Sequence, residues 1–194
     1  QDFLALESIN TNYLKFDFIV GNPPYNINGK LKTPTNSNIK KTDDGKQVYV
    51  EFIKKSLELL KPDGFLACII PSLWLKPDKA GLYDILTNKK IIKLVCLSTS
   101  QTQKAFNYKA QTPTCYFLIQ NTNVEENNKI INIYDDLNEK FINYYLKPNF
   151  PIPINGINII NKLLEFTNIY GSFKIYKSST SSKNSIFNNE FGEK

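Results

Sequence analysis

The sequence has 194 residues, of which 41% are hydrophobic and 13% aromatic, and its formal net charge is +6. This length fits one domain, or one domain with a small appendage, and the apolar content is sufficient for a packed core. All 24 basic residues are lysines, and there is no histidine, which excludes any mechanism that needs an imidazole base. Lysine binds phosphate as a point charge, so the composition favours a polyanionic partner, the alternative being a compositional bias without functional meaning.

The three cysteines, Cys68, Cys96 and Cys115, each lie among apolar residues in a predicted strand. Their spacing differs from that of a C-x-x-C redox or zinc motif. We therefore expect small buried core residues in a reducing compartment, the cytoplasm. No run of about 18 apolar residues occurs, so the sequence predicts no membrane span.

In chain order, the first strong pattern is the apolar run Phe18-Ile19-Val20, which predicts a strand buried on both faces. The tetrapeptide Asn22-Pro23-Pro24-Tyr25 follows directly. Proline lacks a backbone N–H and holds the preceding residue extended, so the strand ends here in a rigid loop. Ligands of open α/β sheets bind at this end of the strands.

The loop offers hydrogen-bond acceptors and an aromatic ring, a combination that suits an exocyclic amine on a planar ring. The side-chain oxygen of Asn22 and the carbonyl of Pro23 can each accept one N–H, and Tyr25 can stack on the ring. Two such hydrogen bonds draw the nitrogen toward tetrahedral geometry and stabilise the positive charge that develops on it during alkylation. This chemistry requires no general base in the first step.

The other elements follow from hydrophobic period and from Gly and Pro punctuation. A polar loop with five lysines over residues 30–47 either contacts the substrate backbone or is a solvated insertion. The elements predicted after it are a helix over 48–60, a turn at 62–64, a strand over 65–70, a helix over 77–88, strands over 91–98, 112–120 and 129–135, and helices over 137–147 and 155–166.

Several of these segments together resemble a known family. Asn22-Pro23-Pro24-Tyr25 after an apolar strand resembles the amine-methylating motif of class I S-adenosylmethionine methyltransferases. Asp2-Phe3-Leu4 resembles the short motif that precedes the catalytic strand, and residues 48–75 resemble the helix, turn and strand that follow the catalytic loop. From residue 2 to about residue 120, the chain is most similar to the gamma-group N6-adenine DNA methyltransferases of restriction–modification systems.

The resemblance implies roles for individual residues. Asp2 and Phe3 would contact the adenine of S-adenosylmethionine, and Asn22, Pro23, Pro24 and Tyr25 would form the catalytic loop. Phe106 matches the aromatic position that stacks on the target base opposite Tyr25. Because the gap to the next strand is about one residue longer than expected, Tyr108 is the alternative, and an ordinary hairpin aromatic is a third interpretation.

The resemblance also implies the architecture. We expect an α/β fold with a partial Rossmann-like methyltransferase sheet, mostly parallel with a terminal antiparallel strand, over residues 1–121. Residues 122–194 are expected to be a small α+β extension, partly disordered, that begins a target-recognition or accessory region. In the family, the Gly-rich loop and the acidic residue that hold the cofactor precede the Asp-Phe motif. The chain would thus be the C-terminal part of a catalytic domain, inactive alone, with an exposed apolar strand edge.

These features lead to a functional hypothesis, a methyltransferase that acts on N6 of a flipped-out adenine in double-stranded DNA. Two alternatives remain at this stage. One is methylation of another planar amine, guanine N2 in ribosomal RNA or a protein glutamine. The other is a non-catalytic fragment that binds DNA or a partner.

Overall fold

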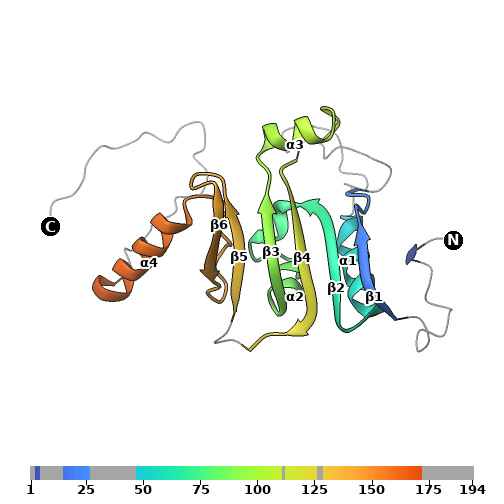
Figure 1. The fold of residues 1–194 in the computed structure, drawn as a ribbon, viewed down its shortest axis with the longest axis horizontal. Helices are drawn as coiled ribbons and strands as arrows, with labels where there is room; N and C mark the ends of the chain where they lie inside the picture. The colour runs from blue at the N-terminus through green and yellow to red at the C-terminus, as the bar shows by residue number, and fades with distance from the viewer. Residues whose placement is uncertain (1–2, 5–14, 27–46, 111, 126–128, 172–194) are drawn as a thin grey trace, which may run out of the picture.

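The computed structural model describes residues 3–4, 15–26, 47–110, 112–125 and 129–171. Within them a six-stranded sheet has the order β1-β2-β4-β3-β5-β6 (Figure 1). The strands are β1 Phe16–Gly21, β2 Leu60–Pro71, β3 Lys89–Cys96, β4 Thr114–Asn123, β5 Ile130–Asp135 and β6 Lys140–Tyr145. The helices are α1 Val48–Leu59, α2 Leu82–Thr87, α3 Thr99–Ala105 and α4 Ile157–Tyr170, with a 3-10 turn at Ser72–Leu75.

The strand directions confirm the predicted α/β class with a mostly parallel sheet. β1 pairs parallel with β2, and β3 pairs parallel with β5. β4 is inserted antiparallel between β2 and β3, and β6 is antiparallel to β5. Four strands therefore point one way and two the other. Because β5 continues the sheet from β3, one sheet spans both sides of the predicted boundary at residue 121, and the division into domains stays a prediction.

The core lies between the sheet and the helices α1 and α2, which cover its far side in Figure 1. Trp74 is completely buried there, its indole N–H donates to the sulfur of Cys115 at 3.2 Å, and its ring meets Phe117 edge-on. We therefore expect Trp74 to stabilise the core by packing rather than to line the candidate site. Cys68, Cys96 and Cys115 are buried free thiols in strands, as predicted.

Gly64 allows β1 and β2 to pair closely where β2 begins. A Cβ at this position would lie 3.1 Å from three backbone carbonyl oxygens, those of Phe16, Asp17 and Lys61. Backbone atoms cannot rotate away as side chains do, so a residue without a side chain is favoured at this position. The preceding Asp63 adopts a positive φ of 62° where the β1–β2 register shifts between Phe16 and Phe18. The turn predicted at residues 62–64 is therefore an irregularity inside β2 rather than a break before it.

β1 departs from the expected burial on both faces. It lies at the edge of the sheet, and Phe18 and Val20 are 67% and 80% exposed. The edge position agrees with the exposed apolar edge that the resemblance implied. The apolar run thus correctly predicts a strand, but the predicted burial on both faces is wrong within the described residues.

Three other elements differ from the sequence prediction. The helix predicted over 137–147 is wrong, because residues 140–145 form β6, where aromatic and β-branched residues pair with β5. The helix predicted over 77–88 begins only at Leu82, since Gly81 holds a left-handed φ of 71° at its N-cap. α3 was not predicted, because its sequence lacks an apolar period.

The last strand pair and α4 are joined by one buried carboxylate. Asp135 is fully buried and accepts hydrogen bonds from the N–H groups of Gly156 and Ile157, at the start of α4, at 3.1 and 2.8 Å. It also accepts from the backbone of Leu137 and the side chain of Asn138.

Within the described residues no helix has both the length and the apolar composition that a membrane crossing requires.

Candidate active site

The Asn-Pro-Pro-Tyr loop leaves the sheet where β1 ends. The last β1 pairing joins Gly21 to Cys68 of β2, after which Pro23 and Pro24 cannot donate to a sheet partner. Asn22 is exposed, Pro23 is buried and Pro24 is exposed. Asn22 is therefore accessible from outside the core at the end of β1.

A cleft of about 270 Å³ lies beside this loop. It contains the three residues Asn22, Pro23 and Pro24 together with apolar side chains of β1, β2 and α1. The residues that line it are Phe3, Ile19, Val20, Gly21, Asn22, Pro23, Pro24, Phe52, Ile53, Ser56 and Cys68. The sequence-predicted residues Phe3 and Asn22–Pro24 thus share one cleft, which Tyr25 does not line.

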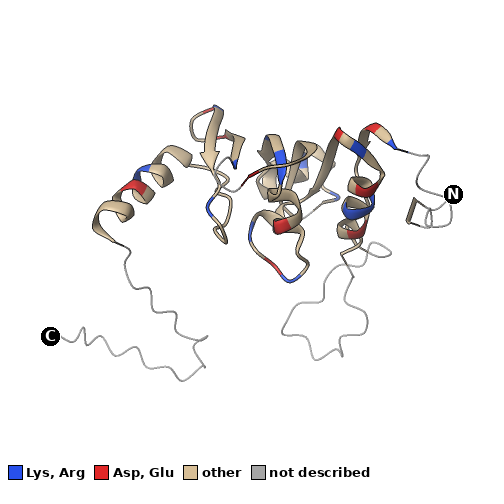
Figure 2. Ribbon diagram, turned by 90° about the horizontal axis from the view of Figure 1, so that it is seen from below, with Lys and Arg blue, Asp and Glu red and all other residues tan. Residues whose placement is uncertain are grey.

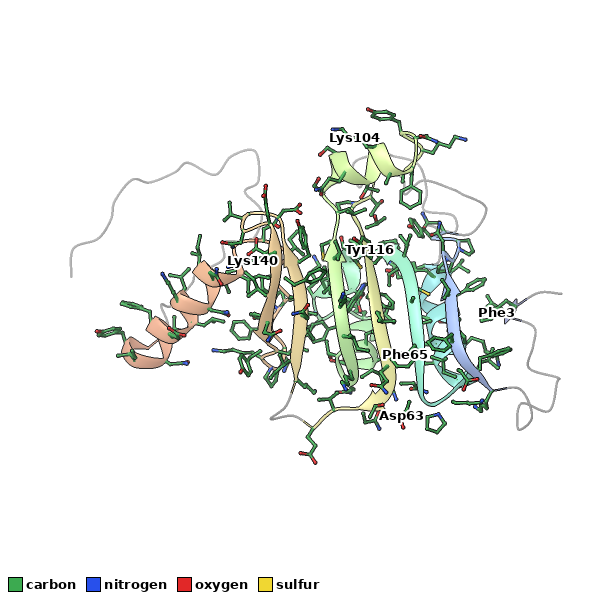
Figure 3. The ribbon with its side chains drawn as sticks, viewed as in Figure 1. Phe3, Asp63, Phe65, Lys104, Tyr116 and Lys140 are labelled. Carbon is green, nitrogen blue, oxygen red and sulfur yellow. The ribbon has the colours of Figure 1, made fainter. Side chains whose placement is uncertain are left out.

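Phe52 is a cleft residue that the sequence reasoning missed. The helical period of residues 48–60 assigned it to the stripe that faces the sheet. In the structure its ring is half-buried and stacks on the ring of Phe3, with centroids 5.2 Å apart and planes 6° from parallel. Figure 3 shows Phe3 at the β1 end of the sheet. The signal that could have found Phe52 is an aromatic residue on a helix that directly follows the loop.

The cleft chemistry fits part of the cofactor implied by the resemblance. Flat apolar rings at Phe3 and Phe52 suit an adenine, and no carboxylate is among the lining residues to hold ribose hydroxyls. The lining contains one thiol, that of Cys68, and one hydroxyl, that of Ser56, which donates to the Phe52 carbonyl at 2.7 Å. Burial raises the pKa of the Cys68 thiol to about 11, against a smaller opposing effect of a backbone hydrogen bond with Gly21. The neutral thiol is a weak competitor for an electrophilic methyl group.

Tyr25 is half-buried and contacts α1 rather than lining the cleft. Its ring meets the ring of Tyr49 edge-on at 6.5 Å, and its hydroxyl is buried with no hydrogen-bond partner among the described residues. Burial, and secondarily the nearby Cys115, raises the pKa of the Tyr25 phenol to about 12. The hydroxyl therefore stays protonated, and Tyr25 can contribute a ring but no phenolate.

The other predicted site residues lie elsewhere or outside the described part. Phe106 is half-buried and ends α3, and Tyr108 is 72% exposed in the turn that follows. Both residues lie in the segment that follows β3. Because β1 and β3 run in the same direction, this segment starts at the same end of the strands as the Asn-Pro-Pro-Tyr loop. Neither lines the cleft. Asp2 and residues 30–46 of the lysine-rich loop lie outside the described residues.

Comparisons with known proteins define first a class, the restriction–modification methylases. The family model described as "Eco57I restriction-modification methylase" matches residues 2–106, more than half of the sequence. The chain belongs to the Eco57I restriction-modification methylase family. The match includes the Asn-Pro-Pro-Tyr loop, the cleft and α3.

The chain is also similar to individual proteins. The chain is 31% identical to the type II restriction enzyme and methyltransferase RM.Eco57I of Escherichia coli over 63% of its length, which is 13% of that protein. It is 29% identical to an uncharacterized adenine-specific methylase of Mycoplasma pneumoniae over 62% of its length and 29% of the relative. A type I methyltransferase subunit from Streptococcus thermophilus has a TM-score of 0.47 at 19% identity, with 86% of this chain and 34% of that chain covered. The chain thus spans less than a third of the length of each curated relative named here.

Proposed function

We propose that this chain is the catalytic part of a site-specific DNA methyltransferase that methylates N6 of adenine. The supporting observation is the exposed residue Asn22 at a proline-locked strand end, which lines a cleft together with Phe3 and Phe52. A relative described as adenine-specific favours adenine among the planar amines. Double-stranded DNA is the proposed partner, from which the adenine must be rotated out to reach the loop.

In this proposal the loop acts by accepting hydrogen bonds from the amino group of adenine. The Asn22 side-chain oxygen and the Pro23 carbonyl each accept one N–H, which makes the nitrogen lone pair available for attack. The same oxygens stabilise the positive charge that develops on nitrogen, and the rigid prolines hold them in place beforehand. Tyr25 stacks on the base, with Phe106 on the opposite face. The alkylated amine is acidic and then loses its proton to water.

S-adenosylmethionine is the proposed cofactor and, when bound, supplies an electrophilic methyl group. Phe3 and Phe52 would contact its adenine, with Asp2 as a further contact from the sequence motif. Ile19, Ile53 and Cys68 give this cleft an apolar wall. Because the Cys68 thiol is buried and neutral, it competes weakly for the methyl group, and the amino group of the target adenine is the nucleophile.

The test uses the full-length protein, DNA and S-adenosylmethionine with a labelled methyl group. Asn22→Ala should lower methyl transfer by at least about 100-fold, the scale of removing one transition-state hydrogen bond, while DNA affinity stays unchanged. The control is Asn158→Ala, an exposed asparagine on α4 at the opposite end of the sheet, which should keep full activity.

Nucleoside analysis of the product decides between the substrates. N6-methyladenine in DNA supports the proposal. Label in ribosomal RNA guanine or in a protein glutamine, with none in DNA, would replace it by one of the alternatives. Undiminished transfer by Asn22→Ala would refute the role of the loop.

A further inference from the structure

The turn after α3, residues Phe106–Ala110, carries an aromatic side chain that the proposed mechanism does not use. Tyr108 is 72% exposed there. Figure 1 shows α3 standing beyond the end of the sheet, and Figure 3 shows Lys104 on its outer side. Since β1 and β3 run in the same direction, the turn lies at the same end of the strands as Asn22, beyond their carboxyl ends.

α3 is firmly attached to the sheet at its first turn. Ser98 and Gln101 form a reciprocal capping box, and the Gln101 amide also donates to Asp136 at 2.9 Å. Thr102 is fully buried, with its hydroxyl 3.1 Å from the hydroxyl of Thr114 in β4. The helix is therefore a fixed support for the turn that follows it.

The backbone of the turn is more strained than the end of a helix requires. The Tyr108 N–H donates to the Gln103 carbonyl and the Asn107 N–H to the Lys104 carbonyl, the two bonds of a Schellman motif. That motif needs one left-handed residue, and Asn107, at φ 49°, supplies it. It does not account for Tyr108, which also has a positive φ, of 61°. A left-handed bulky residue is a rare and costly conformation.

The exposed ring also fails to make the contact usual at this position. In a Schellman motif the residue at Tyr108 packs on the preceding helical turn, but here the ring projects into solvent. Lys104 and Lys109 flank it, and the segment from Leu97 to Thr114 contains no Asp or Glu. On α1, by contrast, basic and acidic residues are mixed (Figure 2). An exposed ring between cations, on a strained but fixed turn, suits a surface of stacked bases between phosphates.

We propose that Tyr108 is a wedge that enters the DNA duplex and fills the space left when the target adenine rotates out. This inference rests on the proposed function. Lys104 and Lys109 contact the flanking phosphates, and the tyrosine ring stacks on the base pairs beside the gap. Phe106, which is half-buried, has the separate role of stacking on the extruded base. In this proposal Tyr108 fills the gap in the duplex, and Phe106 binds the base that has left it.

The experiment compares two duplexes that carry the target sequence, which is mapped first from DNA methylated by the full-length protein. One duplex has adenine at the target position, and the other has an abasic site, which leaves the gap without any base to extrude. Tyr108→Ala should bind both duplexes about 10- to 100-fold more weakly, the effect of one lost base–aromatic stack. Phe106→Ala should weaken only the adenine duplex. Tyr108→Phe should retain wild-type affinity for both.

One further variant, together with the wild type, makes the outcome decisive. Tyr108→Gly relieves the left-handed strain but lacks the ring, so it should be as weak as Tyr108→Ala while unfolding at no lower temperature than wild type. Unchanged binding of the abasic duplex by Tyr108→Ala, or equal losses for Phe106→Ala on both duplexes, overturns the wedge. If the wild type neither binds nor methylates DNA, the proposed function itself fails, which differs from a wild type that is active with Tyr108→Ala unaffected.

Discussion

Tyr25 shows how a single position can combine a favourable ring with an unfavourable hydroxyl. The ring packs edge-on against Tyr49, yet its hydroxyl is buried without a partner among the described residues. A buried polar atom without a hydrogen bond costs about 1–3 kcal/mol. If the role of Tyr25 is to stack on the base, the hydroxyl contributes nothing to catalysis and reduces stability.

Replacement of this hydroxyl should therefore be harmless or beneficial. We expect Tyr25→Phe to increase the free energy of unfolding by about 1 kcal/mol and to retain methyl transfer, whereas Tyr25→Ala should lose transfer. Tyr49→Phe is the control, because the Tyr49 hydroxyl contacts the Gln47 side chain at 3.3 Å, and its loss should not stabilise. Chemical denaturation and the methyl-transfer assay measure both effects. A loss of transfer in Tyr25→Phe would contradict a role limited to stacking.

At the scale of elements, most strands and helices could be predicted because the apolar period that indicates each one lies within its own residues. α1, β3, β4, β5 and α4 lie where the apolar period placed them, within a few residues at their ends, whereas β2 begins at Leu60, five residues before the predicted strand. The 137–147 segment failed because its pairing with β5 depends on a tertiary contact. α3 carries a capping-box signal, Ser98 with Gln101, that could have revealed it without an apolar period.

The candidate site was predictable to a similar degree. Asn22, Pro23 and Pro24 were found from proline chemistry, and the structure places them beside a cleft with Phe3. Phe52 was missed because a helical wheel does not say which part of a helix passes a cleft. The wheel identifies the side that faces the sheet, and the cleft opens at the border of that side.

Asp135 connects three elements and gives a prediction about pH. Burial opposes its charged form, but hydrogen bonds from Ile157, Asn138, Gly156 and Leu137 outweigh that effect and lower its pKa. An aspartate with a lowered pKa in the folded state stabilises the protein above its unfolded pKa, about 3.9. This stabilisation declines below that pH and is lost as the pH falls through the folded pKa.

Asp135→Asn should thus lower the free energy of unfolding by about 1–3 kcal/mol at pH 7, because the amide nitrogen would face backbone donors. The difference from wild type should shrink as the pH falls below about 4. The neighbouring Asp136→Asn makes the same charge change, and its oxygen can still accept from Gln101, so it should cost little. Urea denaturation across this pH range measures both variants. A difference that is constant with pH would contradict the linkage.

At the scale of the whole molecule, the near side of the sheet in Figure 1 stands without a helix over it among the described residues. The register places Phe18 beside Phe65, whose rings stack at 5.3 Å, and places Val20 on the same side. Tyr116 of β4, also on this side, is 45% exposed. Within the described residues this side begins at an unpaired strand edge, and a side that is this apolar favours association with other chains.

The 194-residue chain expressed by itself should therefore self-associate and bind an apolar dye such as anilinonaphthalene sulfonate. The double variant Phe18→Thr with Val20→Thr removes the two most exposed apolar side chains of this side while it keeps good strand formers. It should shift the chain toward monomer in analytical ultracentrifugation and reduce dye fluorescence. Leu163→Thr, an equally apolar exposed position on α4, is the control and should change neither. Equal effects from the control would mean that general surface hydrophobicity, rather than the β1 side of the sheet, drives association.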